Sequence, residues 1–141
     1  MPVRKANAAW KGTLKEGNGK IELESGSFSG QYSFSSRFEN GSGTNPEELI
    51  AGAHAGCFSM AFSLMLENEG FPPENIETTA HVSIEKVGEG FKITKIKLVS
   101  KADIPKIDNE TFQSIANKAK DGCPVSQVLA GTNIELEATL N

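Results

Sequence analysis

Alternation of apolar and polar residues along the chain predicts two groups of β-strands. In the first third, the expected strands cover residues 8–14, 20–23 and 31–38, with glycine-containing turns between them. Further along, the expected strands cover residues 76–87, 91–100 and 133–140. The first group should form an antiparallel meander. The turn Gly88-Glu89-Gly90 should join the first two strands of the second group into a hairpin.

A helical repeat replaces this alternation toward the C-terminal end. Between Asp108 and Asp121, apolar residues recur at helical spacing, which predicts an amphipathic helix that ends at Gly122. A shorter helix is expected over residues 124–130. Because there is no internal repeat and no linker, we predict one domain over residues 1–141, of the α+β class, with antiparallel sheets and a long central helix.

The central helix is predicted from the segment Leu49 to Leu66, which contains no Lys, Arg, Asp or Glu. Its length makes it a candidate membrane span. However, it includes polar residues such as His54, and glutamates rather than basic residues flank it. We therefore expect no membrane and predict a helix buried at the centre of a soluble protein.

Two overlapping capping patterns mark the start of this helix. Asn45 can cap it, Pro46 suits its first position, and Glu48 completes a capping box with Asn45. Thr44 and Glu47 offer the same spacing one residue earlier, so the roles of the two glutamates stay open. Both could also serve only as favourable charge at a helix N-terminus.

Cys57 lies on an apolar face of the predicted helix. At 100° per residue, the side chains within about 60° of it are almost all apolar: Ile50, Ala53, His54, Met60, Ala61 and Leu64. On a neighbouring face, Gly52 and Gly56 are four residues apart and would let a second helix approach closely. This spacing suggests tight packing, including packing across a dimer.

Composition narrows the classes of function. The 141 residues carry 14 Lys+Arg and 18 Asp+Glu, a formal charge of −4, which argues against a nucleic-acid-binding protein. Residues 1–10 lack the apolar core of a secretory signal, so we expect the cytoplasm. In that reducing compartment a structural disulfide would be unusual, and a domain of this length needs none. The two Cys and two His lack metal-site spacing, and we expect no metal.

The two cysteines therefore point to chemistry or to packing. Cys57 could be an inert core residue, because burial alone raises the pKa of a thiol, and reactivity would require a nearby cation. Of the two arginines, Arg37 stands in the less solvated setting. Cys123 precedes Pro124 at the start of a predicted helix, where a thiolate is stabilised. A reversible disulfide between the two thiols is one hypothesis, and passive packing is the other.

Four segments resemble a known family of peroxidases. They are residues 36–39, 43–49, 53–60 and 122–126. Together they resemble the OsmC and organic hydroperoxide resistance family, and the similarity runs along nearly the whole chain. His54 makes the chain more similar to the OsmC branch of the family, because the other branch tends to have tyrosine at that position.

This resemblance implies a thiol-dependent peroxidase that reduces organic hydroperoxides and hydrogen peroxide in oxidative and osmotic stress. It implies an intertwined homodimer with two sites at the subunit interface. No bound cofactor is expected, and a dithiol reductant such as a lipoylated protein would regenerate the enzyme. By family motif, Cys57 is the peroxidatic thiol, Cys123 the resolving thiol, Arg37 the group that stabilises the thiolate, and Glu47 its acidic partner.

Helix geometry adds a constraint on this site. Glu47 and Cys57 are ten residues apart, which on one straight helix means about 15 Å of rise and side chains about 80° apart. A shared site therefore needs a break in the helix or two antiparallel copies that cross near Gly52 and Gly56. We predict the second arrangement. The competing hypothesis is a non-enzymatic dimeric stress protein that binds an apolar ligand at its interface.

Overall fold

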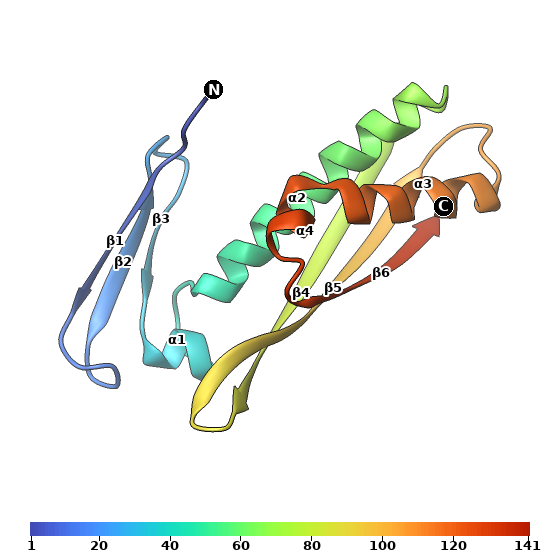
Figure 1. The fold of residues 1–141 in the computed structure, drawn as a ribbon. Helices are drawn as coiled ribbons and strands as arrows, with labels where there is room; N and C mark the ends of the chain where they lie inside the picture. The colour runs from blue at the N-terminus through green and yellow to red at the C-terminus, as the bar shows by residue number, and fades with distance from the viewer. The chain divides into compact units, whose positions relative to one another are not determined.

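The computed structural model describes residues 1–141 and divides into two compact units, Met1–Leu49 and Ile50–Asn141. The chain forms three strands, a short helix, a long helix and then a second set of strands and helices (Figure 1). The long helix α2, Pro46–Asn68, carries the chain from the first unit into the second. Each unit is described in turn.

The first unit contains the predicted antiparallel meander. Its strands are β1 (Ala6–Lys11), β2 (Asn18–Leu23) and β3 (Ser29–Tyr32), hydrogen-bonded in that order. Gly19 in β2 pairs with Trp10 on one side and with Tyr32 on the other. A Cβ at Gly19 would collide with both rings, which lie 5.3 Å apart between centroids. Glycine at this position therefore lets the two aromatic side chains meet over β2.

The predicted strand over residues 31–38 is wrong in its second half. The structure has the short helix α1 there, Phe34–Phe38. The Ser36 backbone N–H donates to Ser33 Oγ at 3.1 Å, and the Ser33 N–H donates to Ser36 Oγ at 2.8 Å. This reciprocal capping satisfies donors at the helix start, and it overrides the alternation of apolar and polar residues that suggested a strand.

The second unit contains a sheet of three strands, drawn side by side in Figure 1. Its strands are β4 (Asn75–Val87), β5 (Gly90–Asp103) and β6 (Asn133–Leu140). The first two form the predicted antiparallel hairpin. β6 instead runs parallel to β5, because the chain crosses over through α3 (Asn109–Gly122) and α4 (Pro124–Val128). The α+β class is confirmed, and the second sheet is mixed rather than fully antiparallel.

An aromatic cluster lies at the centre of this unit's core. The Phe62 ring packs at a tilt against Phe58 and Phe112, with 5.4 Å between ring centroids in each pair, and all three side chains are fully buried. Leu66 of α2 and Leu98 of β5 are also fully buried in this core. The core therefore joins one side of α2 to α3 and the sheet.

The opposite side of α2 departs from the prediction of a buried helix. Met60 is 77% exposed and Leu64 57% exposed, although both share the face of Cys57. A Cβ added at Gly52 or Gly56 would meet no atom within 4 Å. By length and composition α2 is apolar enough to span a membrane, and only 22% of its apolar window is buried within the chain. Within one chain, an apolar strip that contains Gly52, Gly56, Met60 and Leu64 is therefore uncovered.

The core position of Phe62 generates a prediction about stability. Replacing Phe62 with Ala should lower the free energy of unfolding by about 3–5 kcal/mol, because it removes a buried ring and leaves a cavity. Urea denaturation measures this loss. The matched variant Val87→Ala, at a half-exposed hairpin end, should change stability by no more than about 0.5 kcal/mol. Equal losses in the two variants would contradict this description of the core.

Candidate active site

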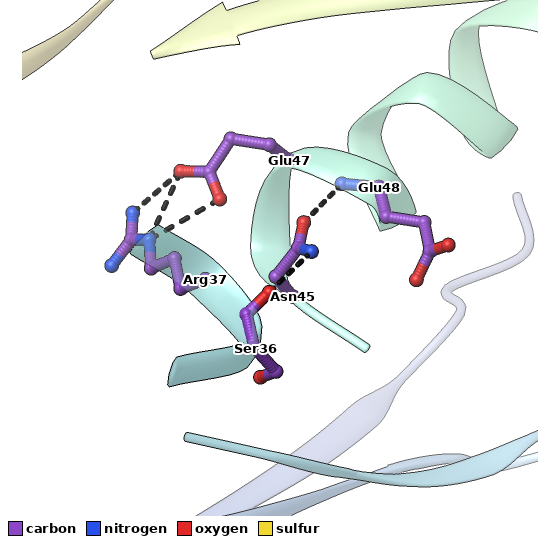
Figure 2. A network of polar contacts seen from close by, with 5 residues as sticks. All are labelled: Ser36, Arg37, Asn45, Glu47 and Glu48. Atoms are coloured by element: carbon purple, nitrogen blue, oxygen red, sulfur yellow. Dashed lines mark hydrogen bonds and ion pairs between the residues drawn. The ribbon is translucent and has the colours of Figure 1, made fainter. Parts of the chain in front are cut away.

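The start of α2 assigns the two glutamates that the sequence left open. The Glu48 backbone N–H donates to Asn45 Oδ1 at 2.8 Å, so Asn45 caps the helix (Figure 2). The Glu48 carboxylate accepts a hydrogen bond from Thr44 Oγ1 at 2.7 Å. Asn45 Nδ2 also donates to the Ser36 carbonyl, at 3.0 Å, and so ties the cap to α1. Glu47 therefore takes no part in the cap, and its side chain is available for another partner.

That partner is Arg37. Arg37 Nε donates to both carboxylate oxygens of Glu47, at 3.1 and 3.2 Å, and Nη2 donates to Oε1 at 2.7 Å (Figure 2). Glu47 is buried, whereas the Arg37 side chain is 36% exposed. Charge-assisted contacts of this kind fix a guanidinium in one orientation. They use the Nε and Nη2 positions and leave the Nη1 side of the guanidinium for another acceptor.

The two thiols also lie in contact with each other. Cys57 Sγ of α2 and Cys123 Sγ are 3.1 Å apart, and both cysteines are free. Cys123 is fully buried, whereas Cys57 is half-buried. Cys123 ends α3 and caps α4, where the Ser126 N–H donates to its sulfur at 3.4 Å. A disulfide requires sulfurs about 2.05 Å apart, so this pair needs only a small approach to close.

The surroundings of the two thiols separate their acidities. Burial raises the pKa of Cys57, the Cys123 contact raises it further, and the Val125 N–H only partly offsets both. Burial also raises the pKa of Cys123, but hydrogen bonds outweigh that effect and leave its pKa below the usual value. The donors are the Ser126 N–H, the Cys57 thiol, the Ser126 side chain and the Val125 N–H. A thiolate is thus stabilised on Cys123 more than on Cys57.

A second contact between α2 and α4 was not anticipated from the sequence. His54 Nε2 lies 2.7 Å from Ser126 Oγ, with both residues buried. Burial lowers the pKa of His54, so its ring is neutral at neutral pH. The sequence held one signal for such a contact, because His54 is a polar residue on an apolar face, three positions before Cys57.

The structure thus brings the four predicted site residues together as two pairs. Arg37 and Glu47 meet within residues 1–49, and Cys57 and Cys123 meet within residues 50–141. The second pair is a dithiol that can close to a disulfide, and the first is a guanidinium held by a carboxylate. No three His, Cys, Asp or Glu side chains gather where they could hold a metal ion.

A family model described as OsmC-like protein matches residues 39–138, a span that includes Glu47 and both cysteines. The chain belongs to the OsmC-like protein family. It is 57% identical to Peroxiredoxin OsmC of Escherichia coli strain K12 over 127 residues, 89% of each chain. It is 32% identical to the Organic hydroperoxide resistance protein of Xanthomonas axonopodis pv. citri, over 71% of this chain and 68% of that protein.

Solved structures carry the same OsmC-like fold. The crystal structure of the organic hydroperoxide resistance protein OhrB of Bacillus subtilis superposes with a TM-score of 0.70 and 25% identity. That comparison covers 97% of this chain and 98% of the other. An OsmC-like protein of unknown function from Vibrio cholerae superposes with a TM-score of 0.76 at 17% identity, and this likeness concerns the fold alone.

The thiol contact in this OsmC-like chain predicts opposite pKa changes in the two single-cysteine variants. Cys123→Ala should lower the pKa of Cys57, because Cys123 raises it through a hydrogen bond and through charge. Cys57→Ala should raise the pKa of Cys123, because it removes a donor to that sulfur. Ultraviolet absorbance of the thiolate against pH, in oxygen-free buffer, measures both values. Changes of the same sign in the two variants would contradict the geometry.

Proposed function

We propose that the chain is a thiol-dependent peroxidase that reduces organic hydroperoxides and hydrogen peroxide. The observation that carries the proposal is the 3.1 Å contact between the sulfurs of Cys57 and Cys123. A dithiol this close can store the oxidising equivalent of one peroxide as a disulfide. The names Peroxiredoxin OsmC and Organic hydroperoxide resistance protein, given to its relatives, support the same activity.

In this proposal the reaction has two chemical steps before reduction. The Cys57 thiolate attacks the distal oxygen of the peroxide, the O–O bond breaks, and the leaving oxygen takes a proton and departs as an alcohol or as water. Cys57 is left as a sulfenic acid. The Cys123 sulfur then attacks Cys57 Sγ, the S–S bond forms, and the hydroxyl group leaves as water. A dithiol such as a lipoylated protein reduces the disulfide by thiol exchange.

In this proposal Arg37, held by Glu47, supplies the positive charge that the surroundings of Cys57 lack. Because burial raises the pKa of Cys57, its thiolate needs a positive charge beside it at neutral pH. We assign this role to the Arg37 guanidinium, whose Nη1 side also orients the peroxide oxygens. Glu47 holds the guanidinium through its two oxygens and fixes the direction in which the remaining donors point.

We infer that two chains complete each site. Glu47 and Cys57 are ten positions apart, and α2 is helical throughout Pro46–Asn68, so no break shortens the expected rise of about 15 Å. Two antiparallel copies of α2 that cross at Gly52 and Gly56 would bring Glu47 of one copy to Cys57 of the other. The uncovered Met60 and Leu64 support this pairing, since it would bury them. We expect this homodimer to work in the cytoplasm.

The uncovered strip of α2 also favours a second candidate function, a dimer that binds an apolar ligand and catalyses no reaction. In that case Cys57 and Cys123 would be passive packing residues, and the burial that raises the pKa of Cys57 would keep it inert. The two candidates differ in whether peroxide consumes the thiols.

Peroxide titration separates the two candidates. One equivalent of cumene hydroperoxide per chain should remove both free thiols and produce a Cys57–Cys123 disulfide, detected by thiol counting and by mass spectrometry of peptides. Cys57→Ser should abolish the reaction, and Cys123→Ser should leave a sulfenic acid on Cys57. Thiols that stay unchanged at this dose would refute the peroxidase and support the ligand-binding dimer.

Replacing Arg37 with Lys tests the role of the planar guanidinium. Lysine keeps the charge but has no second donor nitrogen to hold Glu47 and the peroxide together. We expect kcat/KM for cumene hydroperoxide to fall about tenfold or more, the cost of losing one charge-assisted hydrogen bond. Arg4→Lys is the matched control and should keep the wild-type value. An unchanged kcat/KM in Arg37→Lys would remove Arg37 from the site.

A further inference from the structure

Two contacts side by side join α2 to the start of α4. His54 and Cys57 are three residues apart on α2, and Cys123 and Ser126 are three residues apart at the start of α4. Residues at this spacing lie on the same side of a helix. One contact joins the sulfurs of Cys57 and Cys123 at 3.1 Å, and the other joins His54 Nε2 to Ser126 Oγ at 2.7 Å. The His54–Ser126 contact therefore fixes α4 one turn away from the reacting sulfurs.

Burial of His54 costs free energy that packing alone does not explain. Its side chain is fully buried, yet its Nδ1 has no hydrogen-bond partner. An unpaired buried polar atom costs free energy that an apolar side chain of similar size would avoid. The imidazole at this position therefore points to a task that only its Nε2 performs, and its one partner is the Ser126 hydroxyl.

Ser126 in turn contacts the resolving sulfur. Its backbone N–H donates to Cys123 Sγ at 3.4 Å, and its side chain also favours the Cys123 thiolate. We assign the proton of the His54 ring to Nε2, which leaves Nδ1 as a bare acceptor rather than as an unsatisfied donor. Nε2–H then donates to Ser126 Oγ, and the hydroxyl proton of Ser126 is free to point toward Cys123 Sγ.

Resting on the peroxidase function proposed above, we propose that His54 and Ser126 are positioning residues that hold Cys123 for attack on the oxidised Cys57. The step they promote forms the S–S bond while the S–O bond of the Cys57 sulfenic acid breaks. The Cys123 sulfur is oxidised, the Cys57 sulfur is reduced, and the thiol proton of Cys123 leaves with the hydroxyl group as water. The attack of Cys57 on peroxide does not depend on the pair.

This division of roles predicts which step each variant changes. His54→Leu and Ser126→Ala should form the Cys57 sulfenic acid at the wild-type rate but convert it to the disulfide about 3–10-fold more slowly, the usual range for one lost hydrogen bond. The longer-lived sulfenic acid should then react with more peroxide, so inactivation by sulfinic acid should begin at a correspondingly lower dose. His54→Gln, whose amide N–H can reach Ser126, should recover most of the disulfide rate.

Quenched-flow mass spectrometry measures the sulfenic, disulfide and sulfinic forms of Cys57 over time. The matched control is Ser59→Ala, which removes a hydroxyl of α2 that is bonded to Thr78 instead, at 2.8 Å. This control should keep every wild-type rate. Wild-type disulfide rates in both His54→Leu and Ser126→Ala would overturn the proposal, as would a loss in His54→Gln equal to that in His54→Leu.

A second measurement does not depend on peroxide. In glutathione redox buffers, the equilibrium between dithiol and disulfide reports how well Cys123 is held beside Cys57. His54→Leu, which keeps the Ser126 hydroxyl beside the Cys123 sulfur but no longer holds it, should shift this equilibrium toward the dithiol, with Ser59→Ala unchanged. An unshifted equilibrium would overturn the positioning role even in a protein that reacts with no peroxide. Failure of the wild-type protein to react with peroxide would instead refute the proposed function.

Discussion

Burial of the Cys57 thiol is the constraint on which the proposed site depends. The apolar segment of α2 that builds the core of residues 50–141 also carries Cys57, and burial raises the pKa of that thiol. Its proton is lost at neutral pH only if another group stabilises the thiolate. Cys123 cannot do this, since its contact raises the pKa of Cys57 further. Packing that stabilises the fold thus opposes ionisation of Cys57, and in our proposal the Arg37–Glu47 pair offsets this effect.

The sequence predicted the elements whose signals are local. The Asn45-Pro46 start, the hairpin around Gly88 and the helix that ends at Gly122 all stand where capping, turn and helical-spacing signals placed them. Such signals need only neighbouring residues. For Cys57 and Cys123, local signals left a reversible disulfide and passive packing both open, and the resemblance to a known family supplied their roles.

Other features depended on contacts that local patterns do not specify. The alternation of apolar and polar residues after Gln31 suggested a strand, whereas the reciprocal hydrogen bonds between Ser33 and Ser36 start the helix α1 there. Which of Glu47 and Glu48 pairs with an arginine depends on where the chain places Arg37. The parallel pairing of β6 follows from the path of α3 and α4, and the exposure of Met60 follows from how much of α2 one sheet can cover. The His54–Ser126 contact joins residues 72 positions apart.

The central claim is that each site takes Cys57 from one chain and Arg37 with Glu47 from its partner, and mixed dimers test it most directly. A Cys57→Ser chain and an Arg37→Ala chain, carrying different tags, are co-expressed and the mixed dimer is purified. Each parent homodimer should have little peroxidase activity. The mixed dimer contains one intact site by this account and should regain about half of the wild-type kcat per dimer, because interface residues combine across the two-fold axis. A mixed dimer no more active than the mean of its parents would contradict the claim.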